Sequence, residues 1–141
     1  MVDIKETASI DKKIELVNDL LEKKEPESIT HDSYTDYTGY KPQYVVRAMN
    51  KVFGYGGWGF NEISMKITPP DEKGNTLAVA NLQVWLEDVE NRMSAYGQSR
   101  VTRGDVGDAM KGAQTDALKK ALSYFDIGQR AYFGLLPKPT K

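Results

Sequence analysis

The sequence predicts an α+β protein in which an antiparallel β-meander of at least three strands packs with helices. Three observations predict this fold class. Apolar residues recur at helical spacing in two stretches before residue 54, alternate with polar residues over residues 58–102, and return to helical spacing from about residue 105. The order helix, helix, three strands, helix places the helices on one face of the sheet. We expect an amphipathic N-terminal helix and a long basic helix near the C-terminus.

Length and composition indicate one domain. The chain has 141 residues, of which 40% are hydrophobic and 28% charged, with a net charge of −1. It has no cysteine, which excludes disulfides, a thiol nucleophile and a cysteine-type zinc site. It also lacks an apolar run long enough to span a bilayer and the apolar core of a secretory signal. We therefore expect a cytoplasmic protein without a membrane partner.

The expected domain covers residues 1–135, of which residues 1–41 are a divergent helix and loop. Residues 136–141 are expected to be a tail or the start of a linker. The ending PKPTK is typical of a linker and suggests a natural chain that extends beyond Lys141.

The first helix is expected to start at Ser9, whose hydroxyl can cap it. A narrow apolar stripe follows, made of Ile10, Ile14, Val17 and Leu21. This stripe packs on the domain's own core, packs on a neighbouring subunit, or belongs to a loosely attached arm. Residues 25–41 mix proline, serine, glycine and tyrosine, which predicts an ordered loop or short hairpin.

Pro42 is well placed as the first residue of a second helix, and Gly54 is its expected end. The glycine cluster that follows, FGYGGWGF, runs from helix into strand and lacks the Lys-Ser/Thr ending of a phosphate-binding loop. We therefore interpret these glycines as a helix cap and a tight turn, with Trp58 as a core or interface anchor.

Three strands are expected next. The first runs from Trp58 to residue 67 with a bulge near Glu62, and a turn follows over residues 69–75. The second covers residues 77–86 and includes Leu77, Val79, Asn81, Val84 and Leu86, with Trp85 facing the other way if alternation holds. After a turn over residues 87–91, the third strand covers residues 92–102.

The long helix from about Asp105 is the most informative segment. Residues 96–141 carry eight basic and four acidic side chains, a local net charge of +4. Such asymmetry indicates an anionic partner. We predict that six basic residues bind the phosphate backbone of DNA and line one groove: Arg100, Arg103, Lys111, Lys119, Lys120 and Arg130. Three tyrosines, Tyr96, Tyr124 and Tyr132, lie among them and can stack on bases, although Tyr124 falls in the apolar arc and is expected in the core.

No catalytic, cofactor or metal site is expected. His31 is the only histidine and is interpreted as a solvated loop residue. Asp105 and Asp108 are interpreted as first-turn acids that interact favourably with the helix dipole. Asp116 is positioned to pair with Lys119 or Lys120 within the helix.

Two segments together resemble one known family. Residues 49–60, MNKVFGYGGWGF, resemble the N-F-G-Y-x-G-W junction of the Rad52/Rad22 recombination proteins, and residues 108–125 resemble that family's A-x-x-x-A-x-T-D-x-L-K-R-A-L-x-x-F helix. Between them lie a β-meander and an A-Y-G step, as in the family. The similarity covers roughly residues 42–135, and the short length and divergent start are closest to bacterial or bacteriophage members (Sak-like or DdrA-like).

The resemblance implies an oligomeric ring that binds single-stranded DNA in a positively charged outer groove and anneals complementary strands without a nucleotide cofactor. The family's paired basic residues match Lys119 and Lys120, and a basic residue near the helix start matches Lys111. Two departures weaken the match: Ser123 replaces a further basic residue, and no DNA-contacting hairpin is evident before residue 41. Asp126 also replaces a small residue of several relatives.

The function that we predict is therefore ATP-independent, non-enzymatic annealing of single-stranded DNA in homologous recombination and repair. The expected partners are single-stranded DNA and further copies of the chain, with a single-strand-binding protein or recombinase as further candidates. The expected location is the cytoplasm of a bacterial or phage-infected cell. Three alternatives stay open: a protein that protects DNA 3′ ends without strong annealing, a protein-interaction module, and a metal-dependent nuclease using Asp105 and Asp108.

Overall fold

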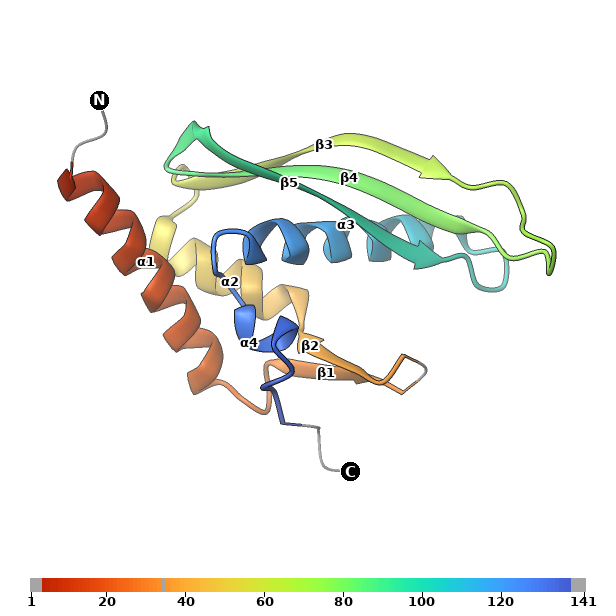
Figure 1. The fold of residues 1–141 in the computed structure, drawn as a ribbon, viewed down its shortest axis with the longest axis horizontal. Helices are drawn as coiled ribbons and strands as arrows, with labels where there is room; N and C mark the ends of the chain where they lie inside the picture. The colour runs from red at the N-terminus through yellow and green to blue at the C-terminus, as the bar shows by residue number, and fades with distance from the viewer. Residues whose placement is uncertain (1–3, 34, 138–141) are drawn as a thin grey trace.

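The computed structural model describes residues 4–33 and 35–137 and shows an α+β fold (Figure 1). A long helix and a small hairpin precede a helix, a three-stranded meander and two further helices. The elements in chain order are α1 (Ile4–Lys23), β1 (Ile29–Asp32), β2 (Tyr37–Tyr40), α2 (Pro42–Phe53), β3 (Trp58–Ile67), β4 (Leu77–Leu86), β5 (Asp88–Arg100), α3 (Val106–Ser123) and α4 (Gln129–Tyr132). The fold class predicted from the sequence is confirmed.

The meander forms one antiparallel sheet with the strand order β3-β4-β5. Helix α3 lies along one face of this sheet, and Figure 1 shows no element across the other face. The bulge predicted near Glu62 is present, because the β3–β4 register shifts between Glu62 and Ser64. Strands β1 and β2 form a separate hairpin beside α4.

Strict alternation along β4 produces the core between sheet and helix. Its helix-facing side chains are all completely buried: Ala78, Ala80, Leu82, Val84 and Leu86. Alanines of α3 pack against them and permit a close approach of helix and sheet. The approach is closest at Gly97 of β5, where a Cβ atom would lie 2.2 Å from the Ala117 nitrogen and 2.5 Å from the Ala113 oxygen.

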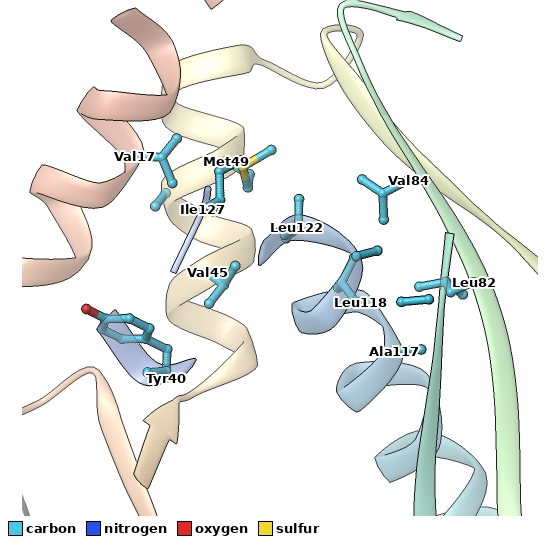
Figure 2. Close-up of a cluster of buried hydrophobic side chains, with 14 of the residues drawn as sticks. Val17, Tyr40, Val45, Met49, Leu82, Val84, Ala117, Leu118, Leu122 and Ile127 are labelled. Carbon is cyan, nitrogen blue, oxygen red and sulfur yellow. The ribbon is translucent and has the colours of Figure 1, made fainter. Parts of the chain in front are cut away.

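A second part of the core joins α1, α2 and the end of α3. Figure 2 shows Val17 of α1 close to Met49 of α2 and Ile127, with Leu122 of α3 between these residues and the sheet. Leu21 of α1 is also buried, so this part of the α1 stripe packs on the domain's own core.

Four local predictions are wrong. Ser9 does not cap α1, because the helix already starts at Ile4. Strand β5 starts at residue 88 instead of residue 92, because Glu87 adopts φ +65° and closes a much tighter turn. Tyr124 is 59% exposed because α3 ends one residue before it. His31 is hydrogen-bonded to Thr38 rather than solvated, since both lie in the β1–β2 hairpin.

Candidate nucleic-acid interface

Helix α2 builds one wall of the candidate site. It begins at Pro42, whose ring presets the helical φ and removes an amide that has no partner in the first turn. It ends at Gly54, which adopts φ +78° and donates its amide to the Asn50 oxygen at 3.0 Å. The Asn50 side chain in turn accepts a hydrogen bond from Trp58 Nε1 at 2.8 Å. This bond ties the end of α2 to the start of β3.

An open groove of about 700 Å³ lies between α2 and α3. Arg47 and Lys51 contribute two positive charges to its lining, and none of the described residues that line it carries a carboxylate. We call it the α2–α3 groove; it is lined by Pro42, Gln43, Val46, Arg47, Asn50, Lys51, Tyr55 and Thr115. A groove that combines open access with positive charge favours a polyanion over a small neutral ligand.

Tyr55 stands at one end of this groove and is 89% exposed. The turn that presents it depends on glycine. A Cβ atom on Gly57 would lie 2.0 Å from the Phe53 carbonyl oxygen, so the chain can only pass this close to the end of α2 without a side chain there. An aromatic ring held in solvent beside two cations is a suitable platform for stacking a nucleobase.

A second groove, of about 380 Å³, lies between α1 and α2. Gln43, Arg47 and Lys51 line both grooves, since they occupy successive turns on the exposed ridge of α2. Lys24 adds a further positive charge, and Glu27 is acidic and also lines this groove. The positive surface therefore extends over the ridge of α2.

Helix α3 contributes Thr115 to the lining of the α2–α3 groove. Lys111, Thr115 and Lys119 recur at every fourth residue and so lie along one side of the helix. Thr115 lines the groove, and Lys111 is exposed one turn away. Lys119 is more enclosed, and its Nζ donates a hydrogen bond to the Tyr40 carbonyl at 3.1 Å. Burial lowers the pKa of Lys119, while the nearby Asp116 opposes this effect in part.

Lys120 lies on a different side of α3. It is nine residues from Lys111, which at about 100° per residue places the two on roughly opposite sides of the helix. The Lys120 ammonium contacts Asp116 Oδ2 at 3.1 Å. The same oxygen accepts the Gln98 amide of β5 at 2.9 Å. Asp116 therefore pairs with Lys120 as predicted, and it also ties the helix to the edge of the sheet.

Arg130 of α4 is held by acidic residues of the N-terminal region. Its guanidinium contacts Glu25 at 3.1 Å and Glu22 at 3.7 Å. Glu25 also accepts a hydrogen bond from the Tyr40 hydroxyl at 2.8 Å. The hydrogen bond with Glu25 raises the pKa of Arg130, and burial together with that same carboxylate raises the pKa of Tyr40. These contacts join α4 to β2 and to the end of α1.

Arg100 and Arg103 lie away from the α2–α3 groove. Arg100 ends β5 and pairs in register with Leu77, on the sheet face that α3 does not cover. Its charge contributes to lowering the pKa of Asp71, after the larger effect of the backbone hydrogen bonds that Asp71 accepts. Arg103 is exposed in the turn before α3 and adopts φ +56°. The six predicted basic residues are therefore distributed over several surfaces. Lys111 is exposed one turn from Thr115, whereas Lys119 lines a smaller pocket with Tyr40 and Tyr132.

The acidic residues considered for a nuclease site have structural contacts. The Asp105 side chain accepts the Asp108 amide at 3.0 Å and caps α3. Over residues 4–33 and 35–137, no group of three or more histidine, cysteine, aspartate or glutamate residues is placed to hold a metal ion. Within the same ranges, no helix has the length and apolar character needed to cross a membrane.

Sequence reasoning missed Arg47, Lys51 and Tyr55. The signal was present, because Arg47 and Lys51 are four residues apart on the polar side of an amphipathic helix. Their significance depends on α3 lying beside them, and the contact between two helices 60 residues apart is not visible in the local pattern. The β1–β2 hairpin before residue 41 was likewise predicted only as one of two options.

The comparison with family models agrees with this architecture. Residues 13–133 match the model for the Rad52/22 family double-strand break repair protein. The match covers most of the chain and extends well before residue 42, where the resemblance seen in the sequence began. The chain therefore belongs to the Rad52/22 family, which places it among proteins of DNA repair and recombination. A search of curated proteins gives no match to this chain. The bacterial or bacteriophage subtype stays a prediction.

Proposed function

We propose that this protein binds single-stranded DNA in the α2–α3 groove and anneals complementary strands without a nucleotide cofactor. The observation that carries the proposal is the groove itself: it is open, Arg47 and Lys51 line it, and none of its described lining residues is a carboxylate. Lys111 and Lys119 lie on the side of α3 that carries its lining residue Thr115. Membership of a double-strand break repair family supplies the biological setting.

Annealing requires that a strand be held by its backbone while its base edges stay free to pair. Arginine and lysine side chains meet the first requirement, since they bind phosphates regardless of sequence and release counterions. Tyr55 contributes a stacking surface, and any nucleobase has a face that can stack. Asn50 is held by Trp58, which leaves few side-chain amides in the groove to read bases. We therefore expect binding without sequence preference.

The six basic residues predicted from the sequence take different roles in this proposal. Lys111 and Lys119 contact phosphates directly in the groove, and the exposed Arg103 extends the positive surface beyond the start of α3. Lys120 reaches DNA only by exchanging its Asp116 contact, and Arg130 stabilises the fold through Glu25.

Self-association of the chain strengthens its binding of single-stranded DNA. One protomer offers a short arc of groove, and copies arranged in a ring join these arcs into a continuous path for the strand. Linked weak sites bind far more tightly than any one of them. A single-strand-binding protein or a recombinase is a further proposed partner, which would deliver or receive the bound strand.

The direct test replaces Arg47 and Lys51, the two cations in the lining of the groove that were not predicted from the sequence. We expect Arg47→Gln/Lys51→Gln to weaken binding of a labelled oligothymidylate, measured by fluorescence anisotropy over a salt series. Two lost phosphate contacts should reduce the magnitude of the log–log salt slope by about 1.4, at roughly 0.7 per contact for single strands. The matched control is Lys12→Gln/Lys73→Gln, which removes two exposed lysines far from the groove.

Equal binding by the groove variant and the control, with both folded by circular dichroism, would contradict the site. Because both replaced groove residues lie on the exposed ridge of α2, the variant should fold like the wild type.

A further inference from the structure

The groove of about 380 Å³ between α1 and α2 has an apolar floor. The two helices lie side by side (Figure 1), and we call this site the α1–α2 groove. Leu21 of α1 and Ala48 of α2 line it and are 1% and 5% exposed, so they form its floor. Leu20 and Tyr44 also line it and are partly buried against the core. An apolar side chain placed here would leave water and contact both helices.

The exposed side chains of the α1–α2 groove include three cations. Lys24 follows the last residue of α1, and Arg47 and Lys51 lie one turn apart on α2. Lys41 adds a positive charge nearby, because its Nζ lies 6.0 Å from the centroid of the Tyr44 ring. An apolar floor with cations around it fits a ligand that carries both carboxylates and an apolar side chain.

Two features of the α1–α2 groove favour an acidic peptide over DNA. Glu27 also lines the groove, and its carboxylate repels phosphates but can accept a hydrogen bond from a peptide N–H. A peptide can place its own carboxylates away from Glu27, whereas every nucleotide of a strand carries a phosphate. The second feature is Tyr44, which is partly buried and has Lys41 over its ring, whereas Tyr55 of the α2–α3 groove is 89% exposed. Its ring therefore offers less surface on which a base can stack.

We propose that the α1–α2 groove binds an acidic segment of a partner protein. An apolar side chain of that segment lies on the floor of the groove, and its carboxylates lie beside Lys24, Arg47 and Lys51. This inference goes beyond the proposed function, because the occupant is a protein and the apolar floor belongs to a different groove.

The acidic segment competes with DNA. Arg47 and Lys51 line both grooves, so a carboxylate on one side of the α2 ridge and a phosphate on the other draw on the same two charges. Each ligand therefore lowers the affinity for the other by the same factor. This competition rests on the proposed function, whereas binding of the acidic segment does not.

A synthetic probe tests the α1–α2 groove without DNA. The probe is a fluorescein-labelled peptide in which a leucine and a phenylalanine are flanked by glutamates, and its binding is measured by fluorescence anisotropy. We expect Lys24→Glu to weaken binding by about threefold or more, because it replaces an exposed ion pair with a repulsion. The matched control is Lys23→Glu, which makes the same charge change at an exposed neighbour outside the described lining of the groove. This control should keep most of the affinity.

A second probe tests the apolar floor. Serines replace its leucine and phenylalanine while its charge stays the same. It should bind about tenfold or more weakly, because two large apolar side chains no longer leave water. This comparison uses the wild-type protein and so does not depend on how a variant folds. Unlabelled oligothymidylate should displace the first probe, and Arg47→Gln/Lys51→Gln should weaken the binding of both ligands.

The outcomes separate this inference from the proposed function. Probe binding that responds to Lys24→Glu, in a protein that does not bind oligothymidylate, would contradict the proposed function and support this inference. Oligothymidylate binding without probe binding would overturn this inference alone. Equal binding of the two probes, or equal weakening by Lys24→Glu and Lys23→Glu, would show charge attraction without a site and overturn it.

Two further outcomes would identify another occupant and overturn the inference. If Lys24→Glu weakens oligothymidylate binding as strongly as probe binding, the α1–α2 groove belongs to the path of the DNA. If Lys24→Glu lowers the assembly mass in light scattering without affecting the probe, the occupant is a second copy of the chain.

Discussion

Lys119 and Lys120 are neighbours in the sequence, but the fold gives their ammonium groups different surroundings. Lys120 has a carboxylate at 3.1 Å, whereas Lys119 has the carbonyl of Tyr40 at the same distance. A neutral carbonyl compensates a buried charge less well than a carboxylate does. Burial of the Lys119 ammonium beside a neutral carbonyl therefore carries a free-energy cost in the folded protein.

That cost predicts a pH dependence of stability. Burial lowers the folded-state pKa of Lys119 below the ordinary value of about 10.4, so the unfolded chain binds more protons between the two pKa values. The penalty is complete below the folded pKa and is relieved as the pH rises towards 10.4. We expect the free energy of unfolding of the wild type, minus that of Lys119→Met, to increase with pH as a urea denaturation series approaches about pH 10.4.

Lys111→Met controls for the loss of one lysine from the same side of α3. In the variant Lys119→Met the Tyr40 carbonyl loses its hydrogen-bond donor, and this loss changes the free energy of unfolding by the same amount at every pH. The pH dependence of the difference between wild type and variant therefore comes from the Lys119 ammonium. A difference that stays constant or falls with pH would show that Lys119 is not desolvated.

At the scale of elements, the approach of α3 to β5 positions the groove wall. Gly97 is the point of contact, and backbone atoms of Ala113 and Ala117 occupy the space of its missing side chain. Backbone cannot rotate away as a flexible side chain can. Any residue other than glycine must therefore move the helix that carries Lys111, Thr115 and Lys119.

We expect Gly97→Ala to lower the free energy of unfolding by about 1–3 kcal/mol or more, as for overpacked cores. Gly56→Ala is the matched control, because a Cβ atom there meets nothing within 4 Å, and its effect should stay within about 0.5 kcal/mol. Chemical denaturation of the two variants measures this directly. Similar stability of both would mean that α3 and β5 are less tightly packed than the structure shows.

The elements were predictable where the sequence follows one strong period. The apolar residues over 77–86 identified β4, and Pro42 with Gly54 bounded α2. The buried face of β4 was predicted only in part, because Leu77 and Val79 lie on the face away from α3 while Val84 and Leu86 are buried. The predicted boundaries of elements were wrong where a single backbone angle sets the length of a turn, as at Glu87. They were also wrong where a helix begins before a possible capping residue, as at Ser9.

The site was less predictable than the fold, because it depends on contacts between distant segments. Helical spacing placed Lys111 and Lys119 on one side of α3, but the enclosure of Lys119 depends on Tyr40, 79 residues earlier. The ion pair between Arg130 and Glu25 likewise joins segments that are 105 residues apart. No local pattern contains this information.

At the scale of the whole molecule, α3 joins the sheet to the rest of the fold, because one side of it packs on β4 and β5 and its Thr115 lines the α2–α3 groove. Membership of the Rad52/22 family places this architecture among proteins of DNA repair and recombination.

The most direct test of the central claim is annealing itself. Two complementary oligonucleotides, one carrying a fluorophore and the other a quencher, are mixed with the protein in a salt series without nucleotide or metal. We expect pairing faster than the spontaneous rate. With about four phosphate contacts per protomer, DNA affinity should fall with salt at a log–log slope near −3, and the acceleration should fade with it. The groove variant Arg47→Gln/Lys51→Gln should lose the acceleration. Binding without acceleration at any salt concentration would contradict annealing, and no binding at low salt would contradict the groove.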